Sequence, residues 1–176
     1  MMNNAVRVHV NLSKIRSAAE EIARRTGVDV LAVIKADAYG LGAREVAAAL
    51  SDVVQGFCFF SLKEAIAANL DLKSRKPSIL LGPPGSMVPQ DYISLNLRPA
   101  VSTVQQAAAL RKADPIPCVD AGMQRFACPA SEIDRVVAAG GCREAFAHAP
   151  TIEQVNRFKE ITTGKGLKLQ DRKSVV

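Results

Sequence analysis

The sequence has 176 residues, of which 48% are hydrophobic, 23% charged and 5% aromatic. These values are typical of a globular protein and exclude a disordered, collagen-like or low-complexity chain. The net charge of +6 is spread along the chain, and two tyrosines without any tryptophan leave little surface on which bases can stack. The composition suits an anionic small molecule at least as well as nucleic acid, and we expect no nucleic-acid partner.

The sequence also bears on where the protein acts. Residues 1–7 contain no apolar run of the kind that a signal peptide needs. No apolar stretch approaches the roughly 18 residues of a membrane span. The four cysteines, at positions 58, 118, 128 and 142, include no CxxC pair, which argues against a zinc ribbon or a disulfide scaffold. We therefore expect a cytoplasmic protein with reduced thiols, no membrane partner and no metal site.

Short apolar runs alternate with Ala-rich amphipathic stretches along the chain. The first helix is expected over residues 13–25, before Gly27, a residue suited to a left-handed helix end. Later helices are expected to begin after Ser61, Thr103 and Thr151, because each is followed three residues later by Glu or Gln in the form of a capping box. The expected strands are residues 30–34, 56–60, 78–81, 97–101, 116–119 and 145–147, with a weaker candidate at 167–169.

Strands and helices that alternate every two dozen residues or so predict a parallel sheet with right-handed crossovers. The GxGxxG fingerprint of dinucleotide-binding doubly wound sheets is absent from the sequence, which favours a (β/α)8 barrel. A complete barrel takes eight units and about 250 residues, whereas this sequence supplies six full units and the start of a seventh. We predict an α/β chain that forms an incomplete TIM-type barrel and that is cut short.

The most informative position is the end of the first strand, because the active site of a parallel barrel lies at the carboxyl ends of its strands. Lys35 follows this strand directly. Burial of an ammonium is costly, which favours a neutral amine that can react with an aldehyde or ketone. The alternative is a lysine whose stem passes the strand end and whose amine lies in solvent. Tyr39, Gly40 and Gly42 suit either a phosphate contact or a plain loop.

Three segments carry a resemblance to a known family. Residues 32–42 (AVIKADAYGLG) resemble the pyridoxal-phosphate attachment signature of alanine racemases. Residues 119–125 (VDAGMQR) resemble the DTGMxR segment of that family, and residues 145–149 (AFAHA) resemble its xTHFA segment. Residues 7–12 (RVHVNL) are similar to the strand that joins the family's carboxyl-terminal domain. The similarity extends over nearly all of residues 7–170.

The resemblance implies pyridoxal 5'-phosphate as the cofactor. Lys35 would hold it covalently and would exchange the α-proton on one face of an amino-acid substrate, so Lys35 is the expected catalytic residue. Tyr39 would contact the cofactor phosphate, Arg125 its phenolic oxygen and His148 the face of its ring. Without the motifs, Arg125 is a surface arginine after a turn and His148 a core histidine at a strand end.

The resemblance also implies a domain organisation and a function. Residues 1–12 would lead in from a second domain, and residues 13–176 would form a partial cofactor-binding barrel without the family's carboxyl-terminal β domain. In alanine racemases, a tyrosine from that domain of the partner subunit in a homodimer serves as the second base. The expected function is interconversion of L- and D-alanine for peptidoglycan synthesis, with this chain an inactive fragment.

Two other functions remain open at this stage. The chain could be a non-catalytic pyridoxal-phosphate carrier on the same barrel, or a racemase of serine, lysine or arginine.

The sequence also departs from the family pattern near Arg125: Cys118 stands where a lysine is common, Ala121 replaces a threonine and Phe126 a leucine. We therefore expect Arg125 to be supported differently in this chain.

Overall fold

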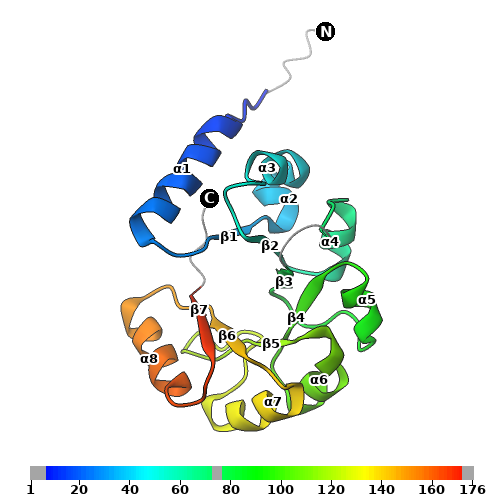
Figure 1. The fold of residues 1–176 in the computed structure, drawn as a ribbon, viewed down its shortest axis with the longest axis vertical. Helices are drawn as coiled ribbons and strands as arrows, with labels where there is room; N and C mark the ends of the chain where they lie inside the picture. The colour runs from blue at the N-terminus through cyan, green and yellow to red at the C-terminus, as the bar shows by residue number, and fades with distance from the viewer. Residues whose placement is uncertain (1–6, 73–76, 172–176) are drawn as a thin grey trace, which may run out of the picture.

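The strands follow one another around a ring, with the helices outside it (Figure 1). The computed structural model describes residues 7–72 and 77–171. β1 to β5 form one parallel sheet in chain order, and β6 pairs in parallel with β7. The amide of Val119 donates to the carbonyl of Phe146 (2.8 Å), which joins the two sheets. The strands are β1 (Leu31–Val33), β2 (Gly56–Phe59), β3 (Ser78–Leu80), β4 (Leu97–Val101), β5 (Ile116–Pro117), β6 (Glu144–Ala147) and β7 (Lys168–Asp171).

A helix follows each strand from β1 to β6, as a TIM-type barrel requires. The prediction of six full units and a seventh strand is confirmed, and no strand pairing joins β7 to β1 within the part of the chain that the structure describes. The helices are α1 (Leu12–Thr26), α2 (Lys35–Gly40), α3 (Ala43–Ala49), α4 (Leu62–Ala67), α5 (Pro89–Ile93), α6 (Val104–Ala109), α7 (Ile133–Gly140) and α8 (Ile152–Thr162), with short 3-10 turns η1 (Arg111–Ala113) and η2 (Ala130–Glu132).

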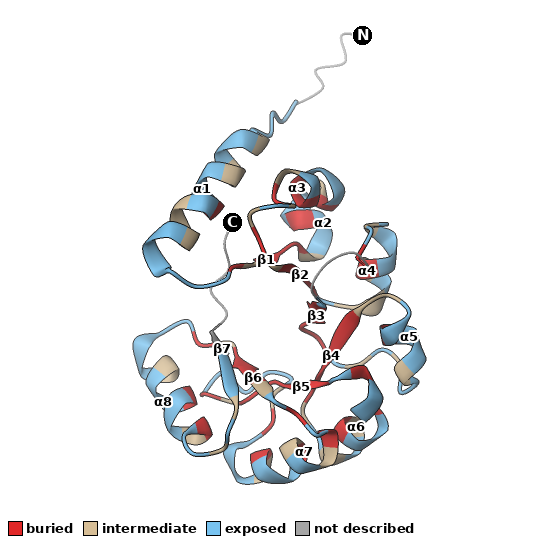
Figure 2. Cartoon of the chain, viewed as in Figure 1, coloured by how far each residue is buried: buried red, intermediate tan, exposed pale blue. Residues whose placement is uncertain are grey.

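The core has two layers because side chains alternate between the two faces of each strand. One face points into the barrel and the other packs against the helices, and Figure 2 shows β1 to β5 as largely buried, whereas the beginning of β7 is exposed. Phe57 and Phe59 of β2 belong to the outer layer, whereas Cys58 between them belongs to the inner one. The inner layer consists of Val33, Cys58, Ile79, Leu81, Ala100, Ile116, Cys118 and Phe146. The barrel is therefore a packed core, and ligands are restricted to its ends.

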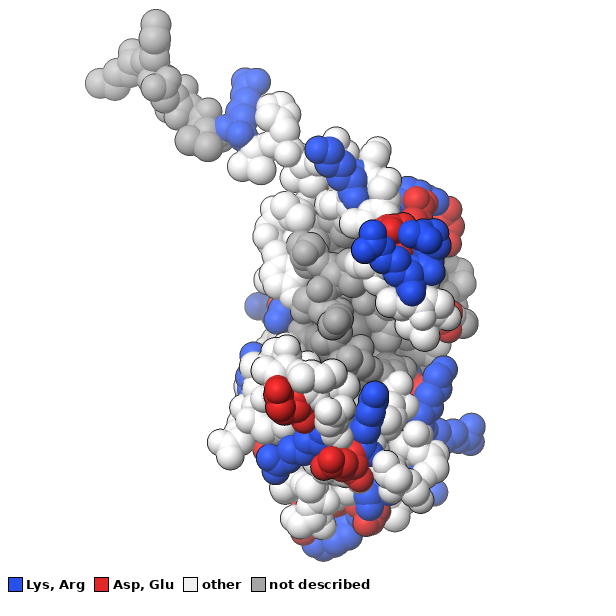
Figure 3. Space-filling model, turned by 90° about the vertical axis from the view of Figure 1, so that its left-hand side faces the viewer, with Lys and Arg blue, Asp and Glu red and all other residues white. Residues whose placement is uncertain are grey.

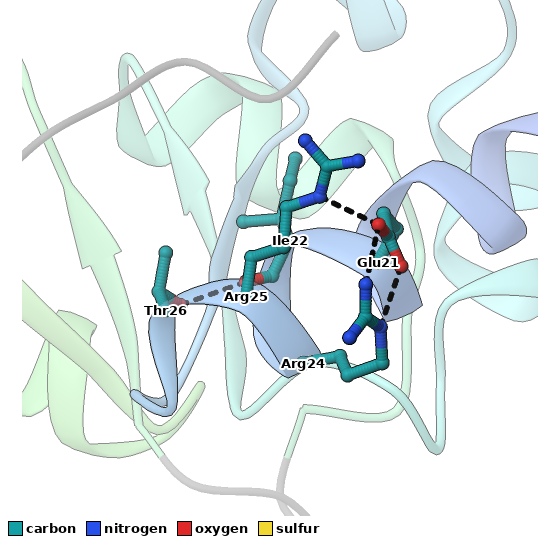
Figure 4. A network of polar contacts seen from close by, with 5 residues as sticks. All are labelled: Glu21, Ile22, Arg24, Arg25 and Thr26. Carbon is teal, nitrogen blue, oxygen red and sulfur yellow. Dashed lines mark hydrogen bonds and ion pairs between the residues drawn. The ribbon is translucent and has the colours of Figure 1, made fainter.

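The end of α1 shows how the sequence determines a helix boundary. Gly27 adopts the left-handed conformation (φ 65°) that was predicted for it. In the preceding turn the Glu21 carboxylate accepts hydrogen bonds from Arg24 and Arg25 (Figure 4). These hydrogen bonds lower the pKa of Glu21 below its usual value. The pairs are exposed and cluster at the surface, so they contribute little to folding.

The three predicted helix starts are confirmed. They differ in which backbone amide donates to the Glu or Gln side chain three residues after the first capping residue. At Thr151 the capping box closes in both directions. At Ser61 the hydroxyl accepts from the amide of Glu64, but the Glu64 carboxylate accepts from the amide of Phe60 (2.9 Å), one residue earlier than in a standard box. The start at Thr103 has the same offset. The offset at Ser61 fixes the backbone of Phe60 directly after β2.

The amino-terminal residues carry no assigned strand where the structure describes them. Residues 7–11 are exposed, and α1 begins at Leu12 because the Asn11 side chain accepts from the amide of Lys14 (3.1 Å). Residues 1–6 of the predicted leading strand lie outside the described residues. The assignment of residues 1–12 to a second domain stays a prediction.

Acidic and basic side chains are interspersed on the molecular face drawn in Figure 3, so the net charge of +6 does not gather there into a one-signed patch. Within the described residues, no helix combines the length and apolar character that crossing a membrane requires.

Candidate functional site

The backbone after β1 has an unusual conformation. Lys35 opens α2, and the four residues 36–39 that follow have φ values of 50° to 58°. None of the four is glycine, and a left-handed conformation costs each such residue roughly 1–2 kcal/mol. Strained backbone of this kind persists only where the surrounding structure holds it, and it is concentrated at functional sites.

Contacts on both sides of the turn hold it in place. Ala38 is buried, and its amide donates to the carbonyl of Ile34 (3.0 Å). The Asp37 carboxylate accepts from the amide of Ala43 (2.7 Å), the first residue of α3. Asp37 thereby ties the strained turn to the beginning of the next helix.

The turn brings together two of the predicted site residues. The Nζ atom of half-buried Lys35 lies 5.6 Å from the centre of the Tyr39 ring, within the range of a cation–π contact. Tyr39 is 44% exposed, so this ring is open to solvent at the barrel mouth. The turn thus places an amine close to a phenol, and the phosphate contact of Tyr39 stays a prediction.

A second loop at the same end of the barrel follows β5. The Asp120 carboxylate accepts from the amides of Gly122 (2.8 Å) and Gln124 (3.0 Å), so it forms the anchor of this loop. Arg125 is exposed and lies between Gln124 (φ 55°) and Phe126 (φ 50°). Arg125 therefore lies at the surface in a loop that Asp120 tethers, and its role toward a cofactor stays a prediction.

The charge state of Asp120 suits an anchor. Burial alone would raise the pKa of Asp120, but the backbone amides of Gln124, Gly122 and Met123 and the charge of Arg157 on α8 together lower it below its ordinary value. The carboxylate is thus ionised at neutral pH and accepts strong, charge-assisted hydrogen bonds. The structure shows Asp120 as the acceptor that holds the loop after β5.

One contact across the mouth was missed by sequence reasoning. The rings of Phe60, which follows β2, and Phe126, in the loop after β5, pack edge to face with centroids 6.1 Å apart. The sequence signals were the aromatic residue that ends the expected strand 56–60 and the phenylalanine at position 126. Neither signal identifies the other ring as its partner.

His148 and Cys118 lie on the β5–β6 side of the barrel. His148 follows β6 directly and is half-buried, with its Nδ1 atom inside the protein. Cys118 is buried in the inner layer of the barrel and forms a bridge with Phe146. The side chain at position 118 is therefore an apolar part of the core, and the loop that carries Arg125 is held by Asp120.

All four predicted site residues lie at the carboxyl ends of the strands. Lys35 and Tyr39 follow β1, whereas Arg125 and His148 follow β5 and β6. A cavity of about 530 Å³ lies at the opposite end of the barrel, lined by residues that include Arg98, Asp114 and Glu144. Its lining is an ion-pair network at the beginning of β4 and β6, so it is separate from this site. Within the described residues, no group of three or more His, Cys, Asp and Glu side chains is placed to hold a metal ion.

Comparison with known proteins identifies the family. The profile of the family described as alanine racemase, N-terminal domain, matches residues 10–169. Alanine racemases of Lactococcus lactis strains SK11 and IL1403 are each 37% identical over 84 residues, which is 47% of this chain and 22% of the relative.

Solved structures show the same fold. The alanine racemase of E. faecalis superposes with a TM-score of 0.75 at 23% identity, covering 93% of this chain and 52% of that one. The enzyme of Bartonella henselae, with covalently bound pyridoxal phosphate, superposes with a TM-score of 0.73 at 18% identity over 92% of this chain and 55% of that one. The alanine racemase of Bacillus anthracis, with bound L-Ala-P, superposes with a TM-score of 0.73 at 20% identity, covering 95% of this chain and 51% of that one.

This chain spans about half the length of these solved relatives. Because the family profile covers most of the sequence and the fold is a TIM-type barrel with a lysine at the end of β1, the chain belongs to the alanine racemase family and corresponds to its amino-terminal domain.

Proposed function

We propose that this chain is the barrel part of a cytoplasmic, pyridoxal-phosphate-dependent racemase that interconverts L- and D-alanine for peptidoglycan synthesis. Family membership supports the class of reaction. The observation that carries the proposal is the strained turn after β1, which holds the amine of Lys35 beside the phenol of Tyr39 at the barrel mouth.

The side chains at this mouth fit the proposed cofactor. Pyridoxal phosphate presents an aldehyde, a phosphate, a phenolic oxygen and an aromatic ring. The mouth offers the amine of Lys35 for the aldehyde and the exposed hydroxyl of Tyr39 for a phosphate oxygen. It also offers the permanent cation of Arg125 for the phenolic oxygen and the imidazole of His148 for the ring face.

In this proposal each residue has a separate task. The Nζ atom of Lys35 binds the cofactor and moves the α-proton on one face of the amino acid. Arg125 keeps the phenolic oxygen in its ionised form, Tyr39 orients the phosphate and His148 restricts the ring plane. When bound, pyridoxal phosphate supplies an electron sink for the electron pair that the departing proton leaves behind.

Racemisation also needs a proton donor on the opposite face, and the second tyrosine of this sequence does not serve. Tyr92 on α5 is fully buried; its hydroxyl donates to the carbonyl of Ser86 (2.8 Å) and accepts from the amide of Ser86 (3.0 Å). Burial raises the pKa of Tyr92 above its usual value. We therefore propose that the 176-residue chain alone does not racemise alanine and that a homodimer of a longer protein supplies the second base.

The test is borohydride reduction of the purified chain after incubation with pyridoxal phosphate, followed by peptide mass mapping. We expect one adduct, on Lys35, that disappears in Lys35→Ala and persists in Lys63→Ala, which removes an exposed lysine of α4. Label spread over many lysines of a chain that is folded by circular dichroism would refute the cofactor assignment.

Activity assays separate the alternatives. Detectable racemisation of alanine by the 176-residue chain would contradict the proposed inactivity. A longer form that binds the cofactor without turnover of any amino acid would indicate the carrier, and turnover of serine, lysine or arginine in preference to alanine would indicate a different substrate.

A further inference from the structure

The loop after β5 holds Arg125 between two strained residues. Gln124 and Phe126 both adopt left-handed backbone conformations (φ 55° and 50°), which are unfavourable for residues other than glycine. Contacts outside the local backbone are therefore needed on each side of Arg125. On the Gln124 side, the amide donates to the Asp120 carboxylate (3.0 Å). On the Phe126 side, the ring packs edge to face against Phe60.

Phe60 is itself firmly placed. Its amide donates to the Glu64 carboxylate on α4 (2.9 Å), and its carbonyl accepts from the amide of Gly82 after β3 (2.9 Å). A Cβ atom on Gly82 would lie 2.6 Å from the carbonyl oxygen of Phe60 and 3.0 Å from its ring. The absence of a side chain at Gly82 thus lets the Phe60 ring lie close against β3. The ring is a fixed support on the β2–β3 side of the mouth.

The contact spans the barrel mouth. β2 and β5 are separated in the sheet by β3 and β4, so a contact between the loops after β2 and β5 bridges that part of the ring. Both rings remain partly exposed, at 37% for Phe60 and 51% for Phe126. Rings that were needed only for the core would be buried in the two core layers, to which neither ring belongs.

We propose that Phe60 is a positioning residue, which orients Arg125 toward the mouth through the ring of Phe126. The inference rests on the proposed function, in which Arg125 binds the phenolic oxygen of pyridoxal phosphate. Asp120 and Phe60 fix the two ends of one short segment, so loss of either support lets the guanidinium leave its position.

The first test uses the ligand-free chain and measures amide hydrogen exchange of residues 121–127. Phe60→Ala is expected to speed exchange of this segment about tenfold, while Phe60→Tyr, which keeps the ring, restores the original rate. Phe126→Ala removes the contact from its other side and should give the same result if Phe60→Ala does not fold. Met87→Ala, which truncates another exposed apolar residue after β3, serves as the matched control and should have no effect. Unchanged exchange in both alanine variants overturns the proposal.

The second test asks whether Phe60 acts through Arg125. Pyridoxal phosphate is titrated and the Lys35 adduct trapped by borohydride is quantified. Phe60→Ala and Arg125→Ala should each require about tenfold more cofactor for half-maximal trapping, and the double variant no more than Arg125→Ala alone. Additive losses in the double variant overturn the positioning role. If the parent chain forms no Lys35 adduct, the proposed function fails, and the exchange measurement alone decides the role of Phe60.

Discussion

The amine of Lys35 lies 5.6 Å from the centre of the Tyr39 ring because the four residues after Lys35, Tyr39 included, are all left-handed. The arrangement places an amine and a phenol on one side of the chain directly after β1. It depends on backbone strain, and the strain is balanced by contacts to neighbouring elements. Variants of those contacts are therefore expected to change both stability and the reactivity of Lys35.

Asp37 is the first such contact. Asp37→Ala removes the acceptor for the amide of Ala43 (2.7 Å) and should lower the free energy of unfolding by about 1 kcal/mol, as loss of a helix cap does. Asp37→Asn keeps an acceptor oxygen and a side chain that tolerates the left-handed region, so it should retain most of the stability. Urea unfolding of both variants measures the difference, and equal destabilisation by the two substitutions would contradict this account.

Asp120 makes stability depend on pH. Because its pKa is lower in the folded chain than its ordinary value of 3.8, the unfolded state binds more protons in the interval between the two values. The stabilisation is therefore complete only above about pH 5 and is lost as the pH falls through the folded pKa. Asp120→Asn, which keeps an acceptor oxygen, should show a smaller loss of stability between pH 6 and pH 3 than the parent chain.

Urea midpoints across this pH interval measure the effect of Asp120. Asp29→Asn, at an exposed carboxylate before β1, is the control. If the urea midpoint of Asp120→Asn falls with pH as steeply as that of the parent chain, other carboxylates cause the pH dependence of stability.

The four cysteines are predicted to be unreactive in the folded chain. All four are buried, and burial raises the pKa of Cys128 and of Cys142 to about 11. The thiolate is the nucleophile, and a thiol with this pKa is only about 0.1% ionised at pH 8. A disulfide reagent such as DTNB should therefore release almost no colour from the folded chain and four equivalents in concentrated urea. Rapid reaction of one thiol without denaturant would refute the burial.

Arg98 at the opposite end of the barrel is predicted to be a stability residue. Its side chain is 11% exposed, and its guanidinium pairs with Asp114 (2.8 Å) and with Glu144 at the beginning of β6. Arg98→Met leaves two carboxylates without their cation and should cost about 3 kcal/mol in the free energy of unfolding. Arg135→Met breaks an exposed pair with Glu132 and should cost less than about 1 kcal/mol. Similar costs in urea unfolding would show that burial does not matter here.

The sequence was sufficient for the order of elements. Apolar runs bounded by turn residues predicted each strand to within one or two residues, because packing on both faces requires such runs in a parallel sheet. The run at 116–119 is shorter as a strand, since β5 ends at Pro117 and the next two residues form isolated bridges with Phe146 and Cys128. At Val119 the pairing partner is Cys128, at the end of the loop after β5, and no local sequence pattern predicts that pairing.

The candidate site was less accessible to sequence reasoning. Lys35, Tyr39, Arg125 and His148 were chosen through motifs, and their roles toward the cofactor stay predictions. The left-handed turn was not predicted, because Ala36, Ala38 and Tyr39 have no local preference for it. The contact between Phe60 and Phe126 depends on the closure of the barrel, which brings distant parts of the sequence together.

The strained turn has a consequence for folding as well. A short peptide with the sequence of residues 30–43 would not retain the turn, because the contacts that offset its strain come from the assembled barrel. Partial loosening of the barrel should then release the turn before the outer helices melt. Selective labelling of Lys35 by an aldehyde would therefore report on the intact barrel. During unfolding, this selectivity should be lost while the helical circular dichroism signal is still near its native value.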